Sequence, residues 1–210
     1  MPLSDARPPI RILLANHQPI VRNGLRLLLE RDPTFQVVAE AADGKETIKL
    51  ADFKRPDVTL LEIELPQVNG IGVAKEILSG ARTSKVLFVT AHTDVGYVIE
   101  AFKAGACGYV AGDSAPVDLA RAIHVVASGG LFLSPAICAN LLEGDAGGAN
   151  MSTYEKDLCC LTVAGYSESE IAAALNADVE KIRVDRLSFK ILFDQNILPD
   201  ILTQCILAAH

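Results

Sequence analysis

The feature that most constrains the fold is a regular alternation of short apolar runs and segments of helical periodicity over residues 11–130. Short apolar runs predict buried strands, and apolar residues spaced three and four apart predict helices. The predicted strands are 11–15, 35–41, 58–63, 85–91 and 107–112, and the predicted helices are 19–32, 45–53, 72–80, 95–105 and 115–130. This order predicts an α/β doubly wound fold, in which helices cover both faces of a parallel five-stranded sheet.

The remainder of the chain has a different pattern. A predicted helix over 134–143 leads into GDAGGAN at 144–150, where three glycines and the lack of a bulky apolar residue indicate a flexible linker. Residues 151–210 have helical periodicity only. We therefore expect three parts, an α/β domain over 9–130, a connecting helix and Gly-rich linker over 131–150, and an all-α helix-turn-helix domain over 151–210.

Helix-capping signals support the all-α part. Ser152 with Glu155, and Ser167 with Glu170, have the spacing of a capping box, in which each side chain accepts from the other residue's backbone N–H. Asp178 is placed to cap the helix that follows it. Two short helices over 168–175 and 179–193, joined by a tight turn, fit a helix-turn-helix.

Composition excludes several classes of protein. No apolar run has the length that spans a bilayer, and MPLSDARPPI lacks the charged start and apolar stretch of a secretory signal, so a cytoplasmic location is expected. The formal net charge is −7, which argues against nonspecific nucleic-acid binding while leaving room for a local basic face.

The cysteines indicate no metal chemistry. No pair forms a CxxC motif and no Cys/His spacing suits zinc, so small buried side chains are the expected role of Cys107, Cys138, Cys159, Cys160 and Cys205. No nucleophile and base, and no complete metal site, can be assembled from the motifs. The sequence therefore predicts a protein that is not an enzyme and that carries no metal or other cofactor.

Several residues, most of them polar, lie at or just beyond the ends of the predicted strands. Sites in doubly wound folds lie at the carboxyl ends of the strands, so these residues should converge on one pocket. They are Asn16, His17, Glu62, Thr90 and Gly112. Glu62 is unusual because it stands in the apolar run VTLLEI, and a buried carboxylate is costly unless it is paired, hydrogen-bonded or protonated.

At this point the chain resembles the NarL/FixJ (LuxR-type) response regulators over nearly its whole length. The resemblance rests on RILLANHQPIVRNGLRLLLE, VVAEAADGKETIKLA, RPDVTLLEIELPQVNGI, VLFVTAHTD, AFKAGACGYV, LARAIHVVASGGLFLSPAI and AGYSESEIAAALNADVEKIRV. It implies a flavodoxin-like receiver domain followed by a LuxR-type helix-turn-helix domain, and a role in two-component signal transduction and transcription regulation.

The resemblance also implies a degenerate, atypical receiver. In the family, two acidic residues after the first strand hold Mg²⁺, and here these positions are Asn16 and His17. The aspartate that accepts the phosphoryl group is replaced by Glu62, and the lysine after the fifth strand by Gly112. Thr90 and the aromatic switch residue, Tyr109, are retained.

These replacements predict that the receiver is not phosphorylated by the usual route. Mg²⁺ prefers carboxylate oxygens and water, and neither the metal nor the lysine would neutralise the transferred charge. Glu62 has two competing interpretations. It mimics the phosphorylated aspartate, bonding Thr90 and drawing Tyr109 inward, or it is a relic bonded to His17 or water. A transition-metal site of His17 and Glu62 has too few ligands.

The second domain leaves two functions open. Residues 181–190 hold most of its basic side chains, and the DNA-binding candidates are Lys181, Arg183, Val184, Arg186, Leu187 and Lys190. A second apolar stripe of Val184, Leu187 and Ile191 favours a protein interface instead. We expect a homodimeric, phosphorylation-independent DNA-binding regulator, and keep as the alternative a regulator whose helix-turn-helix domain binds another protein. The helix near the C-terminus resembles the family's dimerisation helix.

Overall fold

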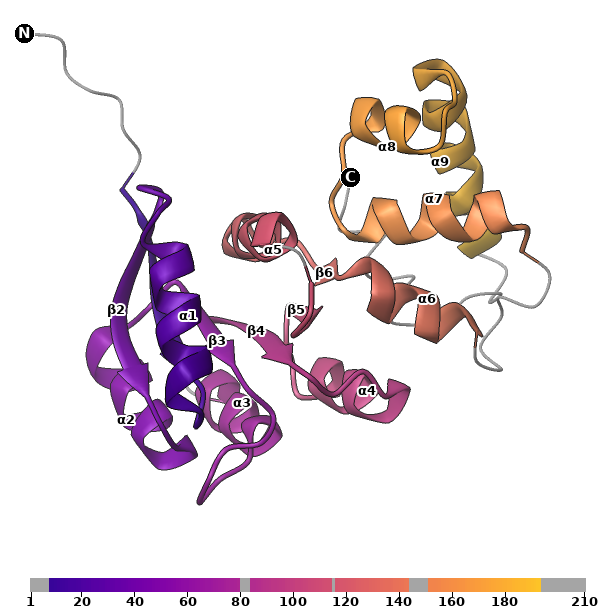
Figure 1. Ribbon diagram of the computed structural model, residues 1–210. Coiled ribbons are helices and arrows are strands. Elements are labelled where there is room, and N and C mark those ends of the chain that lie inside the picture. Colours follow the sequence, from indigo (N-terminus) through magenta and orange to yellow (C-terminus); the bar gives the residue numbers. More distant parts are fainter. Residues whose placement is uncertain (1–7, 80–83, 115, 144–150, 194–210) are drawn as a thin grey trace, which may run out of the picture. The chain divides into compact units, whose positions relative to one another are not determined.

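The structure is a computed structural model that describes residues 8–79, 84–114, 116–143 and 151–193, with side chains described as far as residue 186 in the last segment. The chain divides into two compact units, residues 1–86 and 87–210, which are described separately below. The elements of both units are labelled in Figure 1.

The first unit holds three parallel strands, β1 (Ile10–Ala15), β2 (Phe35–Ala41) and β3 (Val58–Leu61), with β1 in the middle. Their side chains are mostly apolar, and Ile12, Leu13 and Leu60 have no exposed surface. The helices are α1 (Pro19–Leu29), α2 (Gly44–Lys54) and α3 (Gly70–Ser79). Because β3 ends at Leu61, two residues earlier than the predicted 58–63, Glu62 stands just beyond the strand and is half-buried.

The remaining strands lie in the second unit or lead into it. β4 (Lys85–Thr90) begins in the first unit, where the Lys85 N–H donates to the Asp57 carbonyl at 2.9 Å, and ends in the second, where it pairs with β5 (Gly108–Ala111). The strand order is β2-β1-β3-β4-β5-β6. The helices are α4 (Val95–Lys103), α5 (Pro116–Ala127) and α6 (Pro135–Glu143).

The prediction of a five-stranded sheet was wrong, because a sixth strand, β6 (Phe132–Leu133), pairs in parallel with β5. The Phe132 N–H donates to the Cys107 carbonyl at 3.0 Å, and both β6 side chains are fully buried. A run of three apolar residues after a glycine pair is too short to show a periodicity, so sequence pattern could not reveal a strand there.

Three further helices follow in the second unit, α7 (Thr153–Val163), α8 (Glu168–Ala174) and α9 (Val179–Phe193). Both predicted capping boxes are confirmed, at Ser152 and at Ser167. Asp178 accepts from the Glu180 N–H at 2.8 Å, so it caps α9 as expected. The turn between α8 and α9 passes through Asn176 in the left-handed region, at φ 49°.

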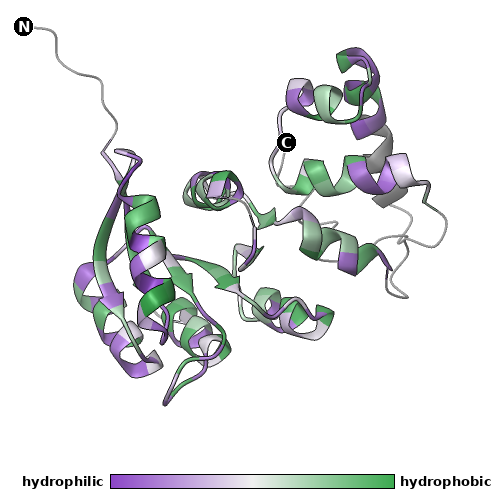
Figure 2. Ribbon diagram, in the orientation of Figure 1, coloured by the Kyte–Doolittle hydropathy of each residue, from purple (hydrophilic) through white to green (hydrophobic). Residues whose placement is uncertain are grey.

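The hydropathy colours of Figure 2 show hydrophilic and hydrophobic residues along the helices, and a mainly hydrophobic β4. Cys138, Cys159 and Cys160 are buried as expected, and burial raises the pKa of the Cys138 thiol. Cys107 is half-buried, and Cys205 lies outside the described residues. Within the described part of the chain, no helix is both long and apolar enough for a bilayer.

Candidate functional site

The strand ends of the first unit bring Asn16 and Glu62 together. Asn16 is 3% exposed, and its side-chain NH₂ donates to Glu62 Oε2 at 3.4 Å. Glu62 Oε1 accepts from the backbone N–H of Ile63 at 2.7 Å and from that of Glu64 at 3.5 Å. The half-buried carboxylate is therefore held by neutral N–H donors, which offset part of its desolvation.

His17 lies beside this pair without joining it. Its Nδ1 is buried and has no hydrogen-bond partner among the described residues. The interpretation of Glu62 as a relic bonded to His17 therefore finds no support in the described contacts. Such an orphaned buried nitrogen is uncommon in folded proteins.

These residues do not fit the Mg²⁺ that the family resemblance implies. The amide oxygen of Asn16 already accepts the Gln18 N–H at 2.8 Å, and His17 offers an imidazole nitrogen. Mg²⁺ takes hard oxygen ligands in near-octahedral geometry. Among the residues that the structure describes, no group of three His, Cys, Asp or Glu side chains is arranged to hold a metal ion.

The second unit contains Thr90 and Gly112 at neighbouring strand ends. Thr90 is 1% exposed, its Oγ accepts from the His92 N–H at 3.3 Å, and its carbonyl accepts from the Gly112 N–H at 2.7 Å. A Cβ at Gly112 would lie 3.3 Å from the Thr90 carbonyl and from the Ala91 nitrogen. A lysine at 112 would therefore require a small backbone shift.

Tyr109 points into the core of the second unit. It has no exposed surface, its ring stacks on Phe88 with centroids 5.9 Å apart, and its hydroxyl donates to the His92 carbonyl at 2.8 Å. The ring thus fills the space beneath the loop that follows Thr90.

The basic side chains at the start of α9 are paired with carboxylates. Lys181 Nζ lies 2.6 Å from Asp185 Oδ2 and 3.9 Å from the centre of the Tyr154 ring. Arg183 contacts Glu180 at 2.6 Å and Glu168 at 3.1 Å. The hydrogen bond that Lys181 donates to Asp185 lowers the pKa of the Asp185 carboxyl and raises the pKa of the Lys181 ammonium.

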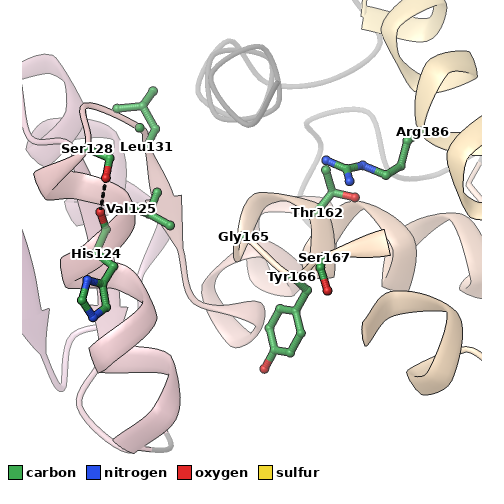
Figure 3. A pocket seen from close by; sticks show the side chains of 10 residues that line it. His124, Val125, Ser128, Leu131, Thr162, Gly165, Tyr166, Ser167 and Arg186 are labelled. Atoms are coloured by element: carbon green, nitrogen blue, oxygen red, sulfur yellow. Dashed lines mark hydrogen bonds between the residues drawn. The ribbon is translucent and has the colours of Figure 1, made fainter. Parts of the chain in front are cut away.

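The other DNA-binding candidates are placed differently. Val184 is 59% exposed on α9. Arg186 turns toward Thr162 of α7 and lines a cavity of about 550 Å³ (Figure 3). The backbone of Leu187, Lys190 and Ile191 belongs to α9, but their side chains lie outside the described residues, so the second apolar stripe stays a prediction.

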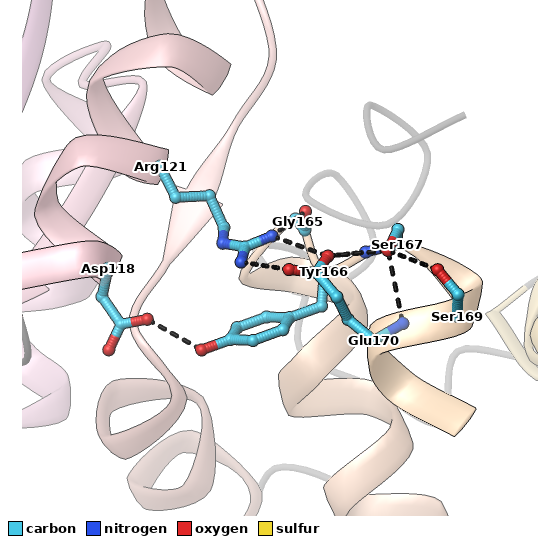
Figure 4. A network of polar contacts seen from close by, with 7 residues as sticks. All are labelled: Asp118, Arg121, Gly165, Tyr166, Ser167, Ser169 and Glu170. Atoms are coloured by element: carbon cyan, nitrogen blue, oxygen red, sulfur yellow. Dashed lines mark hydrogen bonds and ion pairs between the residues drawn. The ribbon is translucent and has the colours of Figure 1, made fainter. Parts of the chain in front are cut away.

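A polar network that the sequence did not reveal joins α5 to the segment between α7 and α8 (Figure 4). The guanidinium of Arg121 donates to both carboxylate oxygens of Glu170, at 2.7 and 3.1 Å, and to the Gly165 carbonyl at 3.1 Å. It also lies 4.0 Å from the centre of the Tyr166 ring. The Tyr166 hydroxyl in turn donates to Asp118 at 2.9 Å. A planar, bidentate contact of this kind fixes orientation as well as distance.

The network makes a pH-dependent contribution to stability. Bonds from Arg121 and Ser167 lower the pKa of Glu170 from 4.5 to about 2. Because the folded pKa is the lower one, the stabilisation is full above about pH 4.5 and is lost as the pH falls toward 2. We expect Arg121→Gln to lower the urea midpoint of unfolding at pH 7. The difference in midpoint between variant and wild type should become smaller below pH 4.5. Urea titrations of both proteins between pH 7 and 3 measure this difference. A difference in midpoint that does not change with pH would contradict a stabilising role for the ionised Glu170 carboxylate.

Comparison with known proteins gives consistent matches. A family model described as "Response regulator receiver domain" matches residues 12–124. The chain is 33% identical over 134 residues to "Transcriptional regulatory protein DegU" of Brevibacillus brevis, covering 64% of this chain and 57% of that protein. It is 32% identical over 170 residues to "DNA-binding transcriptional activator DevR/DosR" of Mycobacterium tuberculosis, covering 78% of each. The crystal structure of a LuxR-family two-component response regulator from Aurantimonas sp. SI85-9A1 shares 38% identity and a TM-score of 0.56, covering 58% of this chain and 86% of that one.

Proposed function

Since this chain belongs to the response regulator receiver family, with similarity to LuxR-type regulators, we propose that it is an atypical response regulator that binds DNA without being phosphorylated. In this proposal it is a homodimeric, cytoplasmic transcriptional regulator and not an enzyme. The names of the relatives, a transcriptional regulatory protein and a DNA-binding transcriptional activator, support the DNA-binding part.

The observation that carries phosphorylation independence is the composition of the pocket. Asn16 and His17 replace the acidic pair, Glu62 replaces the acceptor, and Gly112 replaces the lysine. Phosphoryl transfer depends on positioning and on neutralising the charge of the transferred group. This pocket offers Glu62 held by neutral amides, with no carboxylate pair that would recruit Mg²⁺.

Glu62 and Tyr109 support a permanently active receiver. In this proposal the carboxylate of Glu62 stands in for the charge of a phosphorylated aspartate. The buried Tyr109, bonded to the His92 carbonyl, agrees with an active-like arrangement. The competing interpretation, in which Glu62 is a relic, differs by one consequence: loss of its charge would then leave DNA binding unchanged.

The helix-turn-helix of α8 and α9 would read DNA through Arg183 and Val184. Both are exposed on α9, although Arg183 is paired with Glu168 and Glu180. The alternative, a protein partner for this domain, is favoured by the apolar, 59% exposed side chain of Val184 and by the abundance of carboxylates around the basic residues.

The experiment that tests the proposal is selection of random and genomic DNA fragments by the purified, unmodified full chain, followed by sequencing. We expect an enriched motif with two half-sites and a shallow salt dependence, with a log K against log salt slope of roughly −1 to −3, because few cations are available for phosphate contact. Glu62→Gln, selected in parallel, should enrich the same motif more weakly. Absence of enrichment even at low salt would contradict DNA binding, and equal enrichment by Glu62→Gln would contradict the mimic.

A further inference from the structure

We propose that the cavity between α5, the α7–α8 turn and α9 is a binding site for a small hydroxylated organic anion, such as a hydroxy-substituted carboxylate. The cavity lies entirely within the second unit and has a volume of about 550 Å³. That volume is within the range of sites for small molecules, roughly 300 to 1,000 Å³. Figure 3 shows the lining residues His124 and Ser128 on α5, and Arg186 on α9 beside Thr162.

Arg186 provides the charge for such a ligand. Its Nε is buried and has no hydrogen-bond partner among the described residues. Because a guanidinium stays protonated in proteins, burial cannot remove this charge, and a buried donor without a partner is unfavourable. An anion in the cavity would accept from the terminal guanidinium nitrogens, because Arg186 lines the cavity and no ion pair joins it to a carboxylate among the described residues.

Asp185, which precedes Arg186, and Glu170, which accepts from the lining residue Ser167, are both bonded to other side chains. Asp185 is bonded to Lys181 and Tyr154, and Glu170 is bonded to Arg121. No Asp or Glu is among the lining residues in the described part of the chain. The cavity is therefore cationic within a protein whose net charge is −7.

The rest of the lining selects an organic ligand with a hydroxyl group over a bare inorganic anion. The hydroxyls of Ser128 and Thr162 already donate to the carbonyls of His124 and Leu158, at 2.9 and 2.7 Å. Their oxygens remain as acceptors, which a ligand O–H or N–H would satisfy. Val125 and Leu131 add apolar surface, against which a hydrocarbon frame or ring would pack.

Occupation of this site would couple to DNA binding, a consequence that rests on the proposed function. The walls of the cavity come from α5 and from the segments that carry α8 and α9, and the Arg121–Glu170 contact holds these segments together. A ligand bonded to Arg186 favours this arrangement and adds negative charge beside α9, which disfavours phosphates near that helix. By linkage, the ligand lowers DNA affinity and DNA lowers ligand affinity by the same factor.

Calorimetric titration of the full chain with 4-hydroxybenzoate, benzoate and benzyl alcohol tests the site. We expect 4-hydroxybenzoate to bind more tightly than benzoate, and neutral benzyl alcohol to bind at least about tenfold more weakly than either. Arg186→Gln should lower the affinity for 4-hydroxybenzoate by about tenfold or more. The matched control is Arg183→Gln, which lies on the same helix with its guanidinium outside the cavity. It should bind 4-hydroxybenzoate as the wild type does. Ser128→Trp, at an exposed position on the rim, should block binding by filling the cavity.

Heat of binding that survives Arg186→Gln, or no binding of the hydroxybenzoate at millimolar concentration, would overturn the proposal. The regulatory consequence is measured separately, as the affinity of the selected DNA with and without 4-hydroxybenzoate. A ligand that binds through Arg186 without changing DNA affinity refutes the coupling alone. A ligand that binds through Arg186 to a protein with no DNA affinity supports the site and refutes the proposed function.

Discussion

Incubation with acetyl phosphate and Mg²⁺ should leave the intact mass of the purified protein unchanged. The reason is that each requirement of phosphoryl transfer is missing or altered at the strand ends. The side-chain amide of Asn16 accepts from the Gln18 N–H and donates to Glu62. The Glu62 carboxylate also accepts from the Ile63 and Glu64 N–H groups. Glu62 also places its carboxylate about 1.5 Å farther from the backbone than an aspartate would. In-line attack is sensitive to an error of that size.

Restoring the family residues should restore the reaction. The variant Asn16→Asp/His17→Asp/Glu62→Asp, treated identically, should gain the mass of one phosphoryl group at a rate at least about a hundredfold above wild type, because charge stabilisation of this kind is worth that much in comparable sites. Adding Gly112→Lys tests the last position, and its Cβ has room only if the Thr90–Ala91 backbone moves slightly. Phosphorylation of the wild-type protein would refute the proposal. If the triple variant gains no phosphoryl group, residues other than these three must also be needed for the reaction.

The sequence predicted the central architecture well because its determinants are local. Apolar runs such as VTLLEI fix where strands lie, and Ser152 and Ser167 each mark a helix start through a partner three residues away. The two-residue strand β6 was missed because its hydrogen bonds are to β5, more than twenty residues earlier in the chain. No local pattern contains that information.

The lack of information on distant contacts also explains which site residues were not predicted from the sequence. In the sequence, Arg121 is one basic residue on a helix, and nothing near it indicates a contact with Glu170 in a different helix. Glu170 was predicted only as half of a capping box, although its carboxylate also binds Arg121. Arg186 was grouped with the DNA-binding cations because helical periodicity places it on α9 but cannot show that its side chain lines a cavity.

The electrostatics of α9 bear directly on the choice between DNA and protein as the partner. Lys181 and Arg183 are the exposed cations among the described residues of the helix, and both are engaged by carboxylates within hydrogen-bonding distance. A phosphate group would have to compete with Asp185 and Glu180 for them. Surface ion pairs are individually weak, so DNA can displace them, but the carboxylates would also repel the phosphates.

Neutralising these two carboxylates should therefore strengthen DNA binding. The variant Glu180→Gln/Asp185→Asn frees Lys181 and one side of Arg183 without altering either cation. We expect it to bind the selected DNA about tenfold more tightly at low salt, with a slope of log K against log salt steeper by roughly one to two. Fluorescence anisotropy with labelled duplex at several salt concentrations measures both quantities.

The matched control, Glu143→Gln/Asp157→Asn, changes the net charge equally at exposed positions on α6 and α7. If the effect is local to α9, the control should change affinity much less than Glu180→Gln/Asp185→Asn does. Equal gains from both double variants would assign the effect to net charge alone. No gain from Glu180→Gln/Asp185→Asn would mean that Lys181 and Arg183 do not meet phosphates, and the exposed Val184 side of α9 would then be the surface on which to seek a protein partner.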